Sequence, residues 1–261
     1  MPFELRNIVP WGRNGDEYIR MCALGEKDLR GRILDCAAGP ASFAAEMHER
    51  GYEVVAADPI YVHNAQEIRQ RILEVYDEMI ESAHQDRHRF LWTEKVPDPE
   101  ALGRLRLAAM ERFLFDYPAG QRDGRYVPDS LPRLGFADAT FDLALCSHCL
   151  FLYSGRLTLD FHLASIRELC RVAAETRIFP LIDLAGRPSQ HITPVCAKLR
   201  DEGYAVSIQK VDYEFVKGGN EMMVVRGEGH RFIPSPGTPG EARFIPSPGT
   251  PGEGQGGGAD L

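Results

Sequence analysis

The sequence lacks any apolar run long enough to cross a membrane. A bilayer-spanning helix needs about 20 apolar residues, and the longest candidate, Phe141–Tyr153, is interrupted by Asp142, Ser147 and His148. The first 13 residues also lack the apolar stretch of a secretory signal. We therefore expect no membrane partner.

Cysteine and positive charge are scarce as well. Six cysteines among 261 residues are too few for a disulfide scaffold, which predicts reduced thiols in a cytoplasmic protein. Lys and Arg number 30 against 38 Asp and Glu, so the net charge is −8. Because a nucleic-acid-binding surface is usually basic, this balance argues against a nucleic-acid partner.

Glycine and proline are abundant, but the excess is confined to the end of the chain. Residues 231–241 read RFIPSPGTPGE, and residues 243–253 repeat them without a change. This segment has almost no apolar periodicity, so we expect a disordered tail over residues 228–261 and a folded domain over residues 1–227. A proline-rich ligand for a partner and a tolerated duplication both remain compatible with the repeat.

Strand and helix patterns alternate through the folded part. Short apolar runs predict strands, and apolar residues at helical spacing predict the helices between them. The expected strands are 33–36, 52–57, 141–147, 176–182, 204–212 and 220–226, and the expected helices end at Arg50, span 158–172, and run from a Thr193 cap to about Asp201. The pattern predicts an open α/β sheet, mostly parallel with an antiparallel last strand, and helices on both faces.

One connection is too long for an ordinary crossover. More than 60 residues separate the strand that ends at Asp58 from the next plausible strand, 125–128, whereas such crossovers need about a dozen. Apolar stripes at helical spacing run through residues 68–80 and 102–114. We expect an inserted helical cap at about residues 62–120, whose stripes are packing faces rather than a cofactor site.

The chemistry is expected where the first two strands end, because ligands of open α/β sheets bind at the carboxyl ends of parallel strands. The first strand ends near Asp35, and the small residues Ala37, Ala38 and Gly39 then let the backbone approach a ligand. The second strand ends at Asp58, where a carboxylate can accept both hydroxyl protons of a ribose. Together these features predict nucleoside binding.

At these positions the sequence resembles the class I S-adenosylmethionine-dependent methyltransferases. The family's first motif is a strand, an acidic residue and Gly-x-Gly-x-Gly. It appears here as residues 33–41, ILDCAAGPA, with alanine at the outer two glycine positions. The resemblance spans about residues 14–226 apart from the cap. It implies a Rossmann-like sheet of seven strands and S-adenosyl-L-methionine as the cofactor.

The resemblance also implies a set of cofactor contacts. Asp58 matches the family's acidic residue for the ribose, and Pro59 follows it. Ser130 and Leu131 occupy the place of the family's adenine-side loop. Ser147 ends the fourth strand, where the family's methionine-side contacts gather.

The segment before the first strand adds two expected cofactor contacts. Residues 16–24 can form a short helix, and Arg13 and Tyr18 are placed to fold over the cofactor together with Trp11. Arg13 is then a partner for the methionine carboxylate, as a charge-assisted pair. A solvated arginine and a packed tyrosine are the alternative.

Methyl transfer from a sulfonium is an in-line displacement, for which a protein supplies position and desolvation. A base is needed only if the acceptor loses a proton. His148, at the end of the fourth strand, is the best candidate for a catalytic base or orienter, with a structural histidine as the alternative. Tyr153, Asp183 and Glu214 are expected to line the pocket of a small-molecule substrate.

Other functions compete with this one. A nicotinamide-dependent oxidoreductase would show Gly-x-Gly-x-x-Gly, but the next glycine after Gly39 is Gly51. A cofactor-binding protein without catalysis stays open, because alanine replaces two glycines of the motif. Cys146 and Cys149 have C-x-x-C spacing, yet no second pair lies near them in the sequence, so no metal site is expected.

Overall fold

The computed structural model describes residues 9–227, 230–234 and 242–246. They belong to two units, Met1–Gly227 and Glu228–Leu261. In the second unit, His230–Pro234 (β8) and Ala242–Pro246 (β9) pair as an antiparallel ribbon. The rest of the segment expected to be a disordered tail lies outside the described residues.

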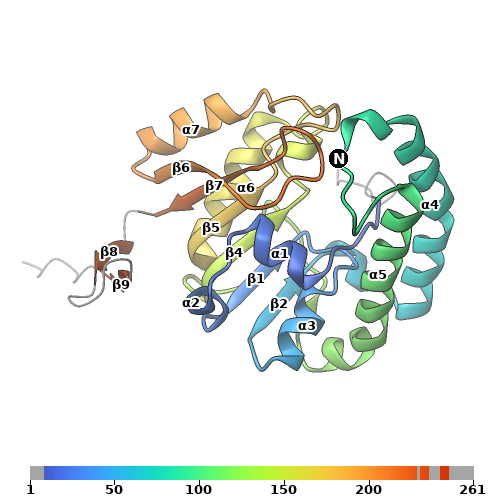
Figure 1. The fold of residues 1–261 in the computed structure, drawn as a ribbon. Coiled ribbons are helices and arrows are strands. Elements are labelled where there is room, and N and C mark those ends of the chain that lie inside the picture. The colour runs from blue at the N-terminus through green and yellow to red at the C-terminus, as the bar shows by residue number, and fades with distance from the viewer. Residues whose placement is uncertain (1–8, 228–229, 235–241, 247–261) are drawn as a thin grey trace, which may run out of the picture. The chain divides into compact units, whose positions relative to one another are not determined.

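A seven-stranded sheet runs through the first unit in the order β3-β2-β1-β4-β5-β7-β6 (Figure 1). The strands β1 to β5 are parallel, whereas β7 runs antiparallel to both β5 and β6. The bounds are Ile33–Cys36 (β1), Val54–Ala57 (β2), Tyr126–Val127 (β3), Phe141–Ser147 (β4), Ala173–Phe179 (β5), Ala205–Lys210 (β6) and Glu221–Arg226 (β7). The expected fold, a mostly parallel Rossmann-like sheet with an antiparallel last strand, is therefore confirmed.

Helices cover both faces of this sheet (Figure 1). The first face carries α1 (Gly15–Met21), α2 (Glu26–Leu29), α3 (Phe43–Glu49), α4 (Ala65–Gln85) and α5 (Pro99–Arg122), and the other carries α6 (Leu159–Val172) and α7 (Ile192–Asp201). Short 3-10 turns follow some strands and helices, at Pro59–Val62 (η2), Arg87–Arg89 (η3) and Phe151–Tyr153 (η4). The expected cap of α7 was wrong: His191 holds the N-cap position, and Thr193 lies inside the first turn.

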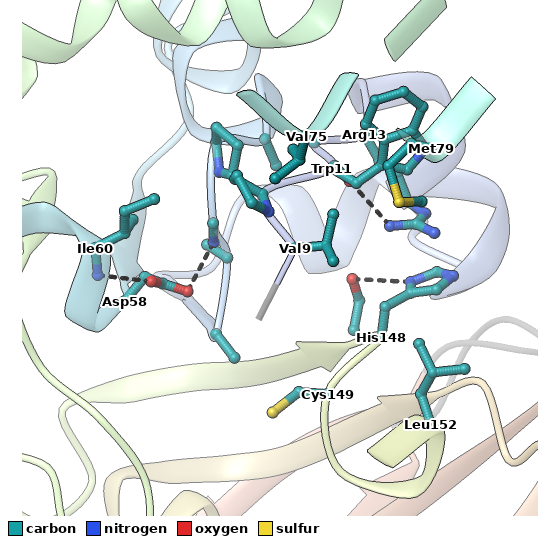
Figure 2. A pocket seen from close by; sticks show the side chains of 18 of the residues that line it. Val9, Trp11, Arg13, Asp58, Ile60, Val75, Met79, His148, Cys149 and Leu152 are labelled. Carbon is teal, nitrogen blue, oxygen red and sulfur yellow. Dashed lines mark hydrogen bonds between the residues drawn. The ribbon is translucent and has the colours of Figure 1, made fainter. Parts of the chain in front are cut away.

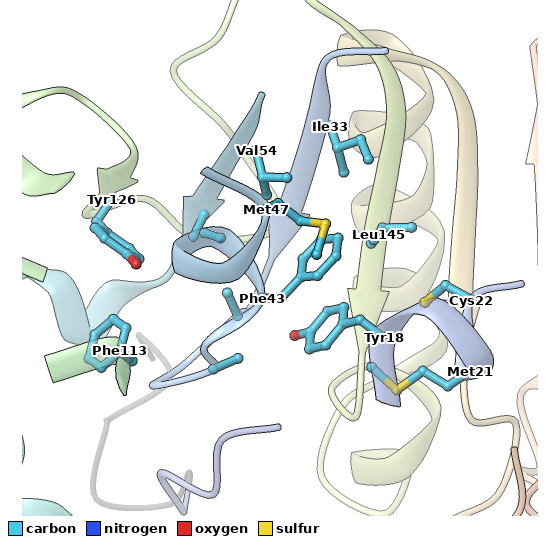
Figure 3. Packing of buried hydrophobic residues seen from close by; sticks show 14 of the residues in the cluster. Tyr18, Met21, Cys22, Ile33, Phe43, Met47, Val54, Phe113, Tyr126 and Leu145 are labelled. Carbon is cyan, nitrogen blue, oxygen red and sulfur yellow. The ribbon is translucent and has the colours of Figure 1, made fainter. Parts of the chain in front are cut away.

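The core consists of two apolar layers, one on each side of the sheet. Figure 3 shows part of the first, where Tyr18 of α1 lies over Phe43 of α3 beside Met47 and Leu145. The rings of Tyr18 and Phe43 are stacked with centroids 4.5 Å apart. Because burying one large apolar side chain contributes about 1.5–3 kcal/mol, this layer fixes α1 against the carboxyl end of β4.

The long insertion forms a helical hairpin with unequal roles for its two helices. Met110 and Phe113 of α5 are fully buried in the core that covers the sheet, and α5 leads directly into β3. α4 packs against α5 and begins at a capping box, in which Asn64 and Glu67 each accept the other's backbone N–H. The insertion is thus a crossover helix with one added helix. Among the described residues, no helix is both long and apolar enough to cross a bilayer.

Candidate functional site at the carboxyl ends of β1, β2 and β4

A cavity of about 490 Å³ opens at the carboxyl ends of β1, β2 and β4 (Figure 2). Its walls come from parts of the chain that are far apart in sequence: residues 9–13, Tyr18, the turn 37–41 after β1, Asp58 and Ile60 after β2, one face of α4, residues between 147 and 156 after β4, and Leu184. The sheet brings the strand ends together, and α4 closes the cavity from the side of the insertion.

The turn after β1 holds a strained backbone. Ala37 has a φ of 59° and Gly39 a φ of 54°, both in the left-handed region. This conformation is free for glycine but costs other residues about 1–2 kcal/mol. Ala37 stands where the resembled motif has its first glycine, and its N–H is still held by the Ala57 carbonyl at 2.8 Å. Strain of this kind commonly marks a ligand site.

Asp58 ties the ends of β1 and β2 together. Its Oδ2 accepts a hydrogen bond from the Gly39 N–H and its Oδ1 one from the Ile60 N–H, both at 2.9 Å (Figure 2). Burial raises the pKa of Asp58 to about 6, although both backbone hydrogen bonds oppose the rise. Pro59 starts η2 directly behind it. Each carboxylate oxygen keeps a second lone pair, which allows Asp58 to accept further hydrogen bonds from a ligand.

Asp35 lies below the turn, at the end of β1, with 1% of its surface exposed. Its Oδ1 is buried and has no hydrogen-bond partner in the described part of the chain. Burial raises the pKa of Asp35 well above its usual range, a hydrogen bond from Tyr18 opposes the rise, and the charge of Asp58 adds to it. A buried acceptor without a partner costs about 1–3 kcal/mol, which a hydrogen-bond donor on a ligand would offset.

Arg13 faces the cavity from the other side (Figure 2). One terminal nitrogen donates to the Trp11 carbonyl at 3.3 Å, but its Nε is buried without a partner in the part of the chain that the structure describes. Burial lowers the pKa of Arg13, and the nearby Arg106 lowers it further. The buried guanidinium therefore keeps an N–H donor that a hydrogen-bond acceptor on a ligand could use.

A buried ion cluster supports Arg13 from behind. Arg106 of α5 pairs with Glu17 of α1, and the Tyr213 hydroxyl donates to the other Glu17 oxygen at 2.8 Å. Burial alone would raise the pKa of Glu17, but the charge and hydrogen bond of Arg106 outweigh it and lower that pKa to about 2. Sequence reasoning missed this cluster, because no spacing connects three residues on α1, α5 and the loop before β7.

His148 follows β4 with a φ of 53° and faces Arg13 across the cavity (Figure 2). Its Nδ1 lies 3.3 Å from the Ser147 hydroxyl, and its ring meets the Phe179 ring edge-on. Burial lowers the pKa of His148 well below its usual range, and the charges of Arg13 and Arg106 lower it further. The imidazole is therefore neutral and keeps one ring nitrogen able to accept a proton.

The structure brings most of the expected site residues together. The cavity wall contains all of the following: Arg13, Tyr18, Ala37, Ala38, Gly39, Asp58, Ser147, His148 and Tyr153. Six expected residues do not line it, namely Asp35, Pro59, Ser130, Leu131, Asp183 and Glu214. Asp183 accepts from the Ala185 and Arg187 N–H groups, and Glu214 from the Gly218 N–H and the Asn220 amide, so both carboxylates are engaged within their own loops.

Sequence reasoning also missed the contribution of α4. Residues at helical spacing on this helix line the cavity, namely Arg71, Val75, Glu78, Met79 and Ser82. Val75 and Met79 belong to the apolar stripe that was expected to be a packing face only. A signal for this second role of α4 was present in the sequence. Ile68 and Ile72, at the start of the apolar stripe, are buried in the core, whereas charged residues neighbour the stripe further along the helix.

No family model matches the chain. The uncharacterised protein MJ0045 of Methanocaldococcus jannaschii is 35% identical to it over 224 residues, which cover 85% of this chain and 97% of that protein. The chain belongs to the family of this archaeal protein.

Several solved structures with a similar chain path are named as methyltransferases. Magnesium protoporphyrin IX methyltransferase from Synechocystis PCC 6803, with bound SAM, is 13% identical, and the match covers 78% of this chain and 73% of that one with a TM-score of 0.41. The PH0226 protein from Pyrococcus horikoshii is 14% identical, with coverage of 76% and 82% and a TM-score of 0.40. For 1,6-didemethyltoxoflavin-N1-methyltransferase from Burkholderia thailandensis, the identity is 20%, the coverage 76% and 71%, and the TM-score 0.36.

Proposed function

We propose that this protein is an S-adenosylmethionine-dependent methyltransferase with a small-molecule acceptor. One observation carries the proposal: among the described residues, the Arg13 Nε donor on the cavity wall is buried without a hydrogen-bond partner, and so is the Asp35 Oδ1 acceptor, two residues before the lining residue Ala37. The methionine end of the cofactor offers a carboxylate and an ammonium group, which suit a buried guanidinium and a buried carboxylate. An unpaired buried polar atom costs about 1–3 kcal/mol. A ligand that forms hydrogen bonds with both of these atoms would remove that cost, which favours this type of ligand.

The remaining residues around the turn suit the nucleoside end. Asp58 has lone pairs for the two ribose hydroxyls, and Ala37 to Gly39 leave the backbone open to close approach. Ser147 and Tyr18 also line the cavity. When bound, the cofactor supplies an electrophilic methyl group on a sulfonium sulfur.

The acceptor belongs on the side of the cavity formed by α4 and residues 147–156. Val75, Met79 and Leu152 give this side an apolar wall (Figure 2), while Arg71 and Glu78 add charge. The mixture suits a small molecule with an apolar body and polar ends better than a polymer. Excluding water from this wall would shield a reactive centre and hold the acceptor in one orientation.

We assign His148, on this wall, as the group that takes up a proton from the acceptor. The low pKa of His148 keeps the imidazole neutral at neutral pH. Ser147 and the backbone bond from the His148 N–H to the Phe179 carbonyl, at 2.6 Å, fix its orientation. An acceptor that loses a proton as it reacts would transfer it to this ring.

Titration calorimetry with S-adenosylmethionine and its demethylated product tests the cofactor assignment directly. We expect binding of both, and absence of binding by the folded protein would refute the methyltransferase proposal. Incubation with a metabolite extract and methyl-labelled cofactor then tests catalysis. Binding without label transfer would favour the alternative of a binding protein without catalysis.

A further inference from the structure

Three of the six cysteines converge below the cavity. Cys36 ends β1 and is the register partner of Cys146 on the adjacent parallel strand β4. Cys36 and Cys146 belong to the same buried apolar cluster, and Cys149, three residues after Cys146, packs against that cluster. Two neighbouring strands and the turn after β4 thus bring three thiols to one place, and all three are free.

The three cysteines differ in how accessible they are from the cavity. Cys36 and Cys146 have 1% and 0% of their surface exposed, whereas Cys149 is partly exposed and lines the cavity on the same turn as His148 (Figure 2). Burial raises the pKa of Cys36 well above its usual range, and a hydrogen bond to Cys149 together with burial raises that of Cys146. A reagent that enters the cavity therefore meets Cys149 first, with Cys146 buried three residues before it in the sequence.

We propose that Cys149 is a redox-modification site, which reacts with small disulfides and is then joined to Cys146. The Cys149 sulfur attacks one sulfur of a disulfide such as oxidised glutathione, the S–S bond breaks, and one glutathione leaves as a thiol with the proton from Cys149. The Cys146 sulfur attacks the Cys149 sulfur, and the second glutathione leaves with the proton from Cys146. The protein loses two hydrogens, and the small disulfide is reduced to two thiols.

The product would change the cavity, because Ser147 and His148 lie between the two cysteines. The bond closes a small ring around them, and His148 already has the left-handed φ of 53°. A covalent ring of this size restricts how the turn presents the imidazole to the cavity. The modification itself does not depend on the proposed function, since its product is read by mass.

The test treats the full-length protein with oxidised glutathione at several pH values, followed by alkylation of the remaining thiols and mass spectrometry. We expect loss of two hydrogens in the peptide that contains Cys146 and Cys149, at a rate that rises with pH because the thiolate is the attacking species. Cys146→Ser should stop at a glutathione adduct on Cys149. Cys170→Ser, which changes a partly exposed thiol on α6, is the matched control and should form the disulfide normally.

Two results would overturn the proposal. The first is full alkylation of Cys149 in wild-type protein after treatment, which needs no variant and therefore holds whatever Cys146→Ser does to folding. The second is loss of the disulfide in Cys36→Ser together with its retention in Cys146→Ser, which would make Cys36 the second partner. Failure of cofactor binding would leave the mass result unchanged, so the two proposals fail separately.

Discussion

Replacing Asp58 by asparagine removes a buried charge and keeps the shape of the side chain. The folded-state pKa of about 6 lies above the ordinary value of 3.8, with burial as the main cause. As the pH rises, the Asp58 carboxyl therefore loses its proton in the unfolded chain before it does so in the folded protein. The free energy of unfolding consequently falls between about pH 4 and pH 6. Because one pKa unit corresponds to about 1.4 kcal/mol, the loss amounts to about 3 kcal/mol and stays constant above pH 6.

Urea unfolding at pH 4, 5, 6 and 7 measures this directly, with wild type and Asp58→Asn side by side. Other buried acids titrate in both proteins, so the quantity to follow is the difference in the free energy of unfolding, which also contains the smaller effect of the Asp58 charge on the pKa of Asp35. The asparagine also loses the hydrogen bond from the Gly39 N–H, but that loss does not vary with pH. We expect the difference to shift by about 2.5 kcal/mol in favour of the variant between pH 4 and pH 7, because the unfolded carboxyl is already partly ionised at pH 4.

The same residue makes cofactor affinity depend on pH. Ribose hydroxyls that donate to Asp58 favour its ionised form, so binding of S-adenosylmethionine should weaken as the pH falls below about 6. Asp58→Asn should bind roughly 10- to 100-fold more weakly at pH 7 and lose this dependence, since a hydrogen bond to a charged group contributes about 1.5–3 kcal/mol. An unchanged affinity, or equal pH profiles for the two proteins, would refute the assignment of Asp58.

The remaining predictions concern the charges behind the cavity. Arg13→Met should lower the affinity for S-adenosylmethionine and its demethylated product roughly 10- to 100-fold in calorimetry, without lowering the melting temperature, because it removes an unpaired buried donor. Glu17→Gln should lower the free energy of unfolding in urea by about 3–5 kcal/mol, because it leaves Arg106 charged in the core. Phe115→Ser is the control, at a side chain that is 90% exposed, and should change the free energy of unfolding by less than about 0.5 kcal/mol. Equal unfolding midpoints for Glu17→Gln and Phe115→Ser would contradict the reasoning.

Local patterns were enough to predict the elements that hold the turn. The apolar run 33–36 and the seven residues 141–147 form β1 and β4 with the expected bounds, because a strand buried on both faces needs a continuous apolar segment. The parallel arrangement then places Asp35, Ser147 and Asp58 at one edge without further information. Site residues that lie at the end of a strand could therefore be predicted from the sequence.

Residues that act through packing between elements far apart in the sequence could not be predicted in this way. Arg106 lies on an apolar stripe of α5 and would be taken for a solvated charge, yet it has 1% of its surface exposed. Its partner Glu17 reads as an ordinary capping residue of α1, a role that it also has. Only the three-dimensional arrangement shows that the insertion reaches the first helix and delivers a charge beneath Arg13.

Gly12 offers a test of how the segment with Trp11 and Arg13 is held on the cavity. A Cβ at this position would lie 2.0 Å from the Pro40 carbonyl oxygen, which is backbone and cannot rotate away. The Ser42 N–H also binds the Arg13 carbonyl at 3.0 Å, so the segment lies tightly on the turn after β1.

Gly12→Ala must therefore lift the segment by at least about 1.4 Å, because an ordinary contact distance begins near 3.4 Å. Because misplacement of a binding group by 1 Å can cost as much as about 100-fold, we expect cofactor affinity to fall at least tenfold, while circular dichroism still shows a folded domain. Gly155→Ala is the matched control, since a Cβ there meets nothing within 4 Å. If both variants bound S-adenosylmethionine as tightly as wild type, the close contact between Gly12 and Pro40 would have no part in placing Arg13.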